Sequence, residues 1–138
     1  MRVRIVIDTN VIVSGVFFGG LPRKVLEFWR SNSFELISSP DILEEYEDVL
    51  NRLVQKTKRA DNQIVERFMK LVVQDCIVIH PKHDLKISRD PDDDKFVNCA
   101  LSGGALYIVS GDSDLLDIEK VDGLDIITAR EFVDILQK

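Results

Sequence analysis

The sequence predicts a three-layer α/β/α domain whose central, mostly parallel sheet has four to five strands. Three observations predict this class. Short aliphatic runs of strand length recur along the chain, amphipathic segments of helix length separate them, and helix-capping residues stand at the junctions. Because strands joined through helices pair in parallel and leave helices on both faces of the sheet, the order of the elements determines the layers.

Length and composition fit a single domain spanning residues 1–138, large enough to bury about two-thirds of its unfolded surface. A hydrophobic content of 45% excludes a disordered chain. No apolar run approaches the roughly 20 residues of a membrane span, and the start lacks the form of a secretory signal, so we expect a cytoplasmic protein without membrane contact. The net charge of −6 argues against nucleic-acid binding by bulk electrostatics. It leaves a nuclease open, since a cation bound by clustered carboxylates reverses the local sign.

The first strand is predicted at residues 3–7, where four of five residues are aliphatic and three are consecutive. This pattern is typical of a strand buried on both faces in the middle of a parallel sheet. Asp8 follows at once, and then Thr9 and Asn10, which we expect to cap a helix ending near Phe17. Ligands bind outside the carboxyl ends of strands in open α/β sheets, so Asp8 is expected at the mouth of any site.

The later elements follow from the same signals. Four further aliphatic runs are predicted to be strands, at 34–38, 76–79, 106–109 and 125–127. The intervals are predicted to be helical, at 23–30, 40–54, from 61 onward, 91–102 and 129–136. A capping residue precedes Pro at both 39–40 and 90–91, which marks a helix start, and the Gly pair at 103–104 marks a helix end.

Helical geometry sorts the carboxylates of the segment 40–54. Glu45 has Ile42 three residues before it and Val49 four residues after it, so it borders the apolar stripe. Glu44 falls on the polar face. Because a charge at the apolar border is costly unless it faces a polar cleft, Glu45 is the candidate functional residue of this helix.

The acidic run at 90–94 needs the same sorting. N-capping accounts for Asp90, and the helix dipole accounts for Asp92. Asp93 lies three residues before Phe96 and is therefore expected on the buried stripe. Dipole compensation does not require an acid there, so Asp93 is the candidate, and we expect Asp94 to be more peripheral.

Two more acids, Asp112 and Asp114, directly follow the predicted strand 106–109. Asp112 is expected near Asp8 if the first and fourth strands are neighbours. Each acidic motif alone is unspecific, because turns are commonly rich in Asp. Four acids at one strand-end edge together predict a hard-cation site, since Mg²⁺ and Mn²⁺ favour carboxylate and water oxygens.

Four segments, at residues 7–10, 43–50, 90–96 and 109–116, together resemble the PIN domain in order and spacing. The resemblance covers essentially the whole chain and is closest to the compact bacterial and archaeal PIN proteins regarded as toxins of toxin-antitoxin pairs. It implies a Mg²⁺- or Mn²⁺-dependent ribonuclease, with RNA as substrate and an antitoxin protein as a candidate partner. The catalytic, metal-binding acids that it implies are Asp8, Glu45, Asp93 and Asp112.

The resemblance also assigns supporting roles. It implies that Asp114 is an auxiliary metal ligand and that Thr9, Asn10 and Ser110 are polar supports. Many family members carry Thr where Ser110 stands, and either hydroxyl can donate a hydrogen bond.

Two surface predictions complete the site. The densest basic run is expected to contact the RNA backbone, although a solvated loop explains its charges equally well; it comprises Arg52, Lys56, Lys58 and Arg59. We also expect a homodimer or larger oligomer, from the family resemblance and from apolar residues near the N-terminal helices, although burial in the core explains these residues equally well; they are Phe17, Phe18, Leu21 and Trp29.

Two other functional classes stay open. The first is a catalytically silent PIN-fold module that binds RNA or protein. The second is an aspartyl-phosphate phosphatase or receiver-like domain, which also places Asp at a strand end beside Mg²⁺. Phosphatases of the haloacid-dehalogenase type would carry a second Asp two residues after Asp8, where Asn10 stands. A nucleotide-binding fold is disfavoured because no Gly-rich loop follows the first strand.

Overall fold

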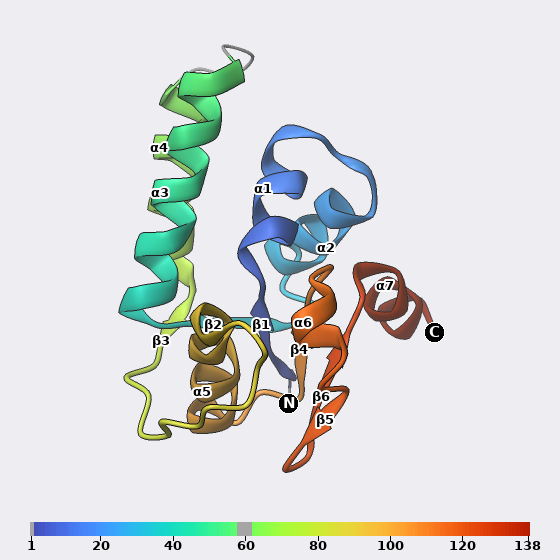
Figure 1. Cartoon of the computed structure of the whole chain (residues 1–138). Coiled ribbons are helices and arrows are strands. Elements are labelled where there is room, and N and C mark those ends of the chain that lie inside the picture. Colours follow the sequence, from blue (N-terminus) through green and yellow to red (C-terminus); the bar gives the residue numbers. More distant parts are fainter. Residues whose placement is uncertain (1, 58–61) are drawn as a thin grey trace.

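A computed structural model describes residues 2–57 and 62–138. Its centre is a six-stranded sheet of order β3-β2-β1-β4-β6-β5, parallel except for β5 (Figure 1). The strands are β1 (Arg4–Ile7), β2 (Glu35–Ser38), β3 (Ile77–Val78), β4 (Tyr107–Val109), β5 (Lys120–Val121) and β6 (Leu124–Ile127). The mostly parallel sheet confirms the predicted class, with one strand more than expected, because the two-residue β5 forms a hairpin with β6.

The helices lie on both faces of this sheet, as the alternating pattern predicts. They are α1 (Thr9–Phe17), α2 (Gly20–Arg30), α3 (Pro40–Thr57), α4 (Asn62–Asp75), the 3₁₀ helix η1 (Pro91–Asp93), α5 (Asp94–Gly103), α6 (Ser113–Leu116) and α7 (Ala129–Gln137). Helix α5 packs against β1, β2 and β4, whereas α7 packs against α2. On the α7 side Phe132 makes edge-to-face contact with Phe34, with ring centroids 5.1 Å apart. In Figure 1, α3 and α4 stand side by side as a long pair.

Strand β1 is the centre of the sheet. Ile5, Val6 and Ile7 are completely buried, as expected for an aliphatic strand covered on both faces. Ile7 pairs with Val109, and the N–H of Asp8 donates to the Val109 carbonyl at 2.9 Å. The carboxyl ends of β1 and β4 therefore meet, which confirms that the first and fourth strands are neighbours. From β1 the chain adds β2 and then β3 on one side, whereas β4, β6 and β5 lie on the other side. The strand order therefore reverses between β1 and β4, and at such a switch point open α/β sheets form a binding crevice.

Several element boundaries differ from the predicted ones. Helix α1 begins at Thr9, with Asp8 as its N-cap residue, and α2 begins at Gly20 rather than at residue 23. The segment predicted as one helix at 91–102 begins with the 3₁₀ turn η1 before α5. Among residues 2–57 and 62–138, the helices lack the combination of length and hydrophobicity that a membrane span requires.

The apolar residues near the N-terminal helices are mostly packed. Trp29 is only 4% exposed, Phe17 and Leu21 are half-buried, and Phe18 is 60% exposed. The apolar surface available there for an oligomer interface is therefore narrower than the sequence suggests.

Candidate metal centre

The hydroxyl of Ser110 ties together the two strand ends at the centre of the sheet. It donates to Oδ2 of Asp8 at 2.7 Å and accepts from the N–H of Asp112 at 2.9 Å. Asp8 is 4% exposed and Ser110 is 1% exposed. Burial raises the pKa of Asp8, and the Ser110 hydrogen bond opposes that rise. The nearby Asp112 carboxylate raises the Asp8 pKa further.

Asp93 is the most perturbed acid of the site. It ends η1, and its Oδ2 is buried with no hydrogen-bond partner among the described residues. Burial raises the pKa of Asp93 to about 8, with further contributions from Asp112, Asp8 and Asp90. A buried carboxylate oxygen without a donor is costly, so this atom calls for a proton or a cation.

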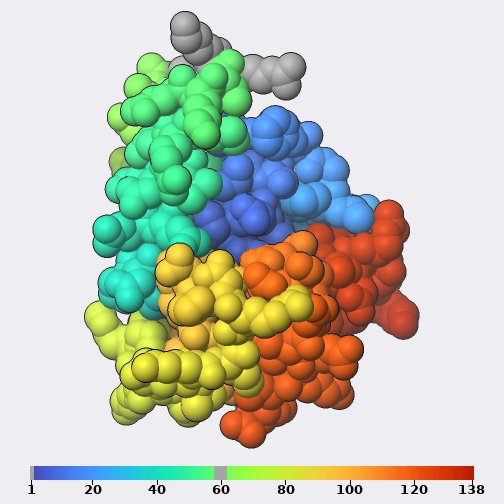
Figure 2. Space-filling model, viewed as in Figure 1, coloured from blue at the N-terminus to red at the C-terminus, as the bar shows by residue number. Residues whose placement is uncertain are grey.

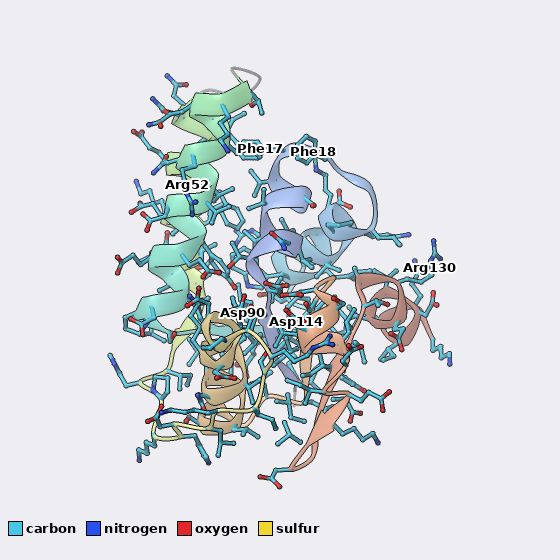
Figure 3. The ribbon with its side chains drawn as sticks, viewed as in Figure 1. Phe17, Phe18, Arg52, Asp90, Asp114 and Arg130 are labelled. Carbon is cyan, nitrogen blue, oxygen red and sulfur yellow. The ribbon has the colours of Figure 1, made fainter. Side chains whose placement is uncertain are left out.

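Three carboxylates converge at the same point. Oxygens of Asp90, Asp93 and Asp114 all lie within 4.8 Å of one another. Asp90 caps η1 by accepting from the N–H of Asp92 at 3.0 Å, and Asp112 caps α6 by accepting from the N–H of Asp114 at 3.0 Å. Two helix starts therefore bring their acids together across the mouth of the site. In Figure 3 the labels of Asp90, just before η1, and of Asp114, in α6, stand next to each other, and in Figure 2 the corresponding yellow and orange segments touch below α1 and α3.

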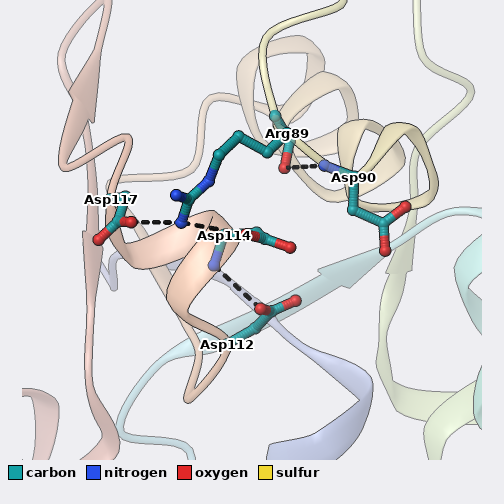
Figure 4. Close-up of polar contacts among 6 residues, drawn as sticks. Arg89, Asp90, Asp112, Asp114 and Asp117 are labelled. Carbon is teal, nitrogen blue, oxygen red and sulfur yellow. Dashed lines mark hydrogen bonds and ion pairs between the residues drawn. The ribbon is translucent and has the colours of Figure 1, made fainter.

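Arg89 lies at the outer edge of this cluster. Its guanidinium pairs with Asp114 at 3.1 Å and also with Asp117 (Figure 4). The Arg89 side chain is 64% exposed, so solvent screens these pairs and their contribution to stability is small. The pairs place Asp114 between Arg89 and the other acids.

Glu45 reaches the site from α3. Its Oε2 accepts a hydrogen bond from the hydroxyl of Thr9, and its Oε1 pairs with the ammonium of Lys95. Glu45 is half-buried, whereas its neighbour Glu44 is exposed, as the helical pattern predicts. Both oxygens of Glu45 therefore have partners from other elements.

The prediction that Asp94 is peripheral is wrong. Asp94 is 8% exposed, and its Oδ1 accepts from the N–H groups of Ile87 and Ser88 at 3.1 and 2.8 Å. Asn98 holds the same loop through two hydrogen bonds to the backbone of Leu85, at 2.8 and 3.1 Å. Asp94 thus anchors the loop that precedes η1, because its carboxylate accepts from two backbone N–H groups of that loop.

The predicted site residues occupy distinct places. Besides burial, the carboxylates of Asp112 and Asp8 raise the pKa of Asp93, and Asp114 joins Asp93 in the three-carboxylate group. Glu45 is engaged with Thr9 and Lys95 instead, and the side chain of Asn10 is exposed. Arg52 and Lys56 are exposed on α3, while Lys58 and Arg59 lie outside the described residues.

Sequence reasoning missed three residues here. The sequence pattern explains Asp90 as an N-cap alone. In the structure Asp90 caps η1 and also belongs to the three-carboxylate group, because an N-cap carboxylate keeps a second oxygen free. Lys95 and Arg89 contact acids from other elements, which no local pattern signals. Their positions directly beside the acidic run were the only available hint.

The donor set fits a hard divalent cation. Carboxylate oxygens are the ligands that Mg²⁺ and Mn²⁺ prefer, and a bound cation would give the buried Oδ2 of Asp93 the partner that it lacks among the described residues. A bound cation would also relieve the mutual repulsion that raises the pKa of Asp93.

Comparison with known proteins gives a consistent result. A model of the PIN domain matches residues 4–114. An uncharacterized protein of Methanocaldococcus jannaschii is 28% identical over 148 residues, an alignment that covers 100% of this chain and 94% of that protein. The solved PIN domain of RRP44 from T. brucei superposes with a TM-score of 0.53 at 15% identity, covering 97% of this chain and 80% of that one. At that identity the structural match speaks for the fold alone.

Proposed function

This chain belongs to the PIN domain family, whose members are typically nucleases, and on that premise we propose that it is a Mg²⁺- or Mn²⁺-dependent endoribonuclease that hydrolyses RNA phosphodiester bonds. The observation that carries the proposal is the buried, unpartnered Oδ2 of Asp93 amid the carboxylates of Asp8, Asp90, Asp112 and Asp114. Such an arrangement is destabilising without a cation and suited to one.

The residues of the site have different proposed roles. Asp8, Glu45, Asp93 and Asp112 would hold the cation, with Asp90 and Asp114 as further candidate ligands. The bound cation would make a water molecule a better nucleophile and stabilise charge on the phosphate oxygens. Ser110 holds the carboxylate of Asp8 in place, and Thr9 holds that of Glu45. Glu45, at the border of the site, would contribute a ligand oxygen and help to orient the attacking water. No side chain needs to form a covalent intermediate.

The basic residues of α3 suggest where the RNA backbone lies. Arg52 and Lys56 follow Glu45 by seven and eleven residues, so all three share one face of α3. At the helical rise they stand about 10 and 16 Å along the axis from Glu45. Figure 3 shows Arg52 above the acidic cluster on this helix. We propose that this face carries the strand away from the cleavage point, which makes binding salt-dependent.

The partners that we propose follow from the family resemblance. They are a cognate antitoxin protein, which would make this chain the toxin of a pair, and a second copy of the chain. Phe18 supplies the most exposed aromatic surface for such contacts among the four N-terminal apolar residues. Light scattering that finds only monomer at tens of micromolar concentration would reject the homodimer.

The proposed activity is tested with purified protein on RNA. Cleavage should require Mn²⁺ or Mg²⁺, stop with EDTA and be lost in Asp8→Asn. Sequencing the new 5′ ends after induced expression of wild type and Asp8→Asn would then give the target. A protein that folds and binds Mn²⁺ but cuts no RNA would be a silent binding module, and labelling by acetyl phosphate would point to the aspartyl-phosphate class.

A further inference from the structure

Lys95 stands in the first turn of α5, beside the acids but outside the proposed ligand set. Its ammonium pairs with Oε1 of Glu45, whose Oε2 accepts from Thr9. Both side chains of the ion pair are 27% exposed, so water and salt screen it less than a fully exposed pair. The charge of the Glu45 carboxylate is thus balanced by the ammonium of Lys95.

The other candidate ligands contrast with Glu45. Asp93 keeps a buried oxygen without a partner, and Asp90, Asp93 and Asp114 approach one another closely. Glu45 is not in that group. A divalent cation and an ammonium cannot both contact the same carboxylate oxygen on the side that faces the acids, because two positive charges so close together repel strongly.

We propose that Lys95 is the internal counter-ion of Glu45 in the metal-free protein and that a bound divalent cation displaces its ammonium from Oε1. The inference rests on the proposed function, since it assumes that the site binds a divalent cation. Lys95 acts through Glu45 and is therefore a positioning residue. The Lys95 ammonium balances the negative charge of Glu45 until a cation binds. Cation binding is weaker as a result, because the Lys95–Glu45 ion pair has to break first.

The first experiment uses the wild-type protein. A brief pulse of an acetylating reagent, followed by mass spectrometry of the peptides, reports how accessible each lysine amine is. We expect Mg²⁺ to raise the acetylation of Lys95 severalfold over the EDTA sample, while Lys70, exposed on α4, stays unchanged as an internal control. Unchanged or lowered acetylation of Lys95 at a Mg²⁺ concentration that saturates the site would overturn the inference.

The second experiment measures Mn²⁺ affinity by calorimetry in Lys95→Met, Lys95→Arg and the control Lys70→Met. We expect Lys95→Met to bind Mn²⁺ roughly three- to tenfold more tightly than wild type, because methionine has no positive charge that competes with the ion for Glu45. Lys95→Arg and Lys70→Met should stay within about twofold of wild type. In a Glu45→Gln background, Lys95→Met should have little further effect, because it acts through Glu45.

The outcomes separate the two proposals. If wild type binds neither Mg²⁺ nor Mn²⁺, the proposed function falls and the inference falls with it. If wild type binds Mn²⁺ but Lys95→Met binds it equally or more weakly, only the inference is overturned, and the ion pair is purely structural. An equal gain in affinity with and without Glu45 would also overturn it, because a general charge effect would then suffice.

Discussion

Ser110 and Asp8, 102 residues apart in the chain, share a buried hydrogen bond of 2.7 Å between the ends of two neighbouring strands. The same hydroxyl accepts from the backbone N–H of Asp112 at 2.9 Å. One small side chain thus fixes an acid at the end of β1 and the start of the loop that carries the next acid.

Ser110→Ala should destabilise the protein and shift its pH dependence. Losing a buried hydrogen bond to a charged group costs about 1–3 kcal/mol of unfolding free energy. The hydroxyl lowers the pKa of Asp8 against burial, so its removal should raise that pKa and move the acidic limb of the activity profile to higher pH. Urea unfolding measures the change in stability, and a pH–rate profile measures the shift of the acidic limb.

Two control variants accompany Ser110→Ala. Ser110→Thr should keep wild-type behaviour, and Ser113→Ala tests an exposed position. A Ser110→Ala profile identical to that of wild type would contradict this role.

Asp93 should make the metal-free protein less stable as the pH rises. Its pKa is about 8 in the folded state against an ordinary 3.8, so between these values the folded state holds a proton that the unfolded chain releases. Stability therefore falls with rising pH across this window, by at most about 1.4 kcal/mol per pH unit for one proton, and levels off above it. Asp93→Asn should flatten the slope in urea unfolding with EDTA present. An unaltered slope would show that other groups carry it.

The fold could be predicted largely because buried aliphatic strands leave a strong local pattern. Residues Ile5 to Ile7 are an example, and their burial also placed Asp8 at the sheet edge. Strand β5 escaped prediction because Lys120 and Val121 form only a two-residue edge that depends on its partner strand. The face of Glu45 followed from helical spacing, but its pairing with Lys95 joins two helices, which spacing within one helix does not reveal.

Asp94 illustrates the same limit. Its neighbours Ile87 and Ser88 reach it through a loop that folds back, so its burial has no periodic signal. We expect Asp94→Ala to leave two backbone donors unpaired and to loosen this loop, at a cost of about 1–3 kcal/mol. Limited proteolysis should then cut within residues 80–88 faster than in wild type, while Asp92→Ala, at an exposed position, should not change the rate. Equal cleavage in both variants would argue against the anchoring role.

Tyr46 holds the end of strand β1, just before Asp8, through a buried hydrogen bond. Its buried hydroxyl donates to the carbonyl of Ile7, directly before Asp8, and burial raises its pKa well above 10, so the hydroxyl keeps its proton at all working pH values. Tyr46→Phe should lower the unfolding free energy by roughly 1–2 kcal/mol. Thermal unfolding with EDTA measures this. A variant as stable as wild type would show that the hydrogen bond contributes nothing net.

The central claim is that particular acids, and not acidity in general, form the catalytic metal site. The most direct test is the rate of Mn²⁺-dependent RNA cleavage in two pairs of sequence neighbours, Asp93→Asn with Asp92→Asn and Glu45→Gln with Glu44→Gln. Asp93 and Glu45 are at least partly buried at the site, whereas Asp92 and Glu44 are exposed. We predict a loss of roughly a hundredfold in Asp93→Asn and Glu45→Gln, with near-wild-type rates in their neighbours. Equal losses within each pair, or no loss in either member, would contradict the account.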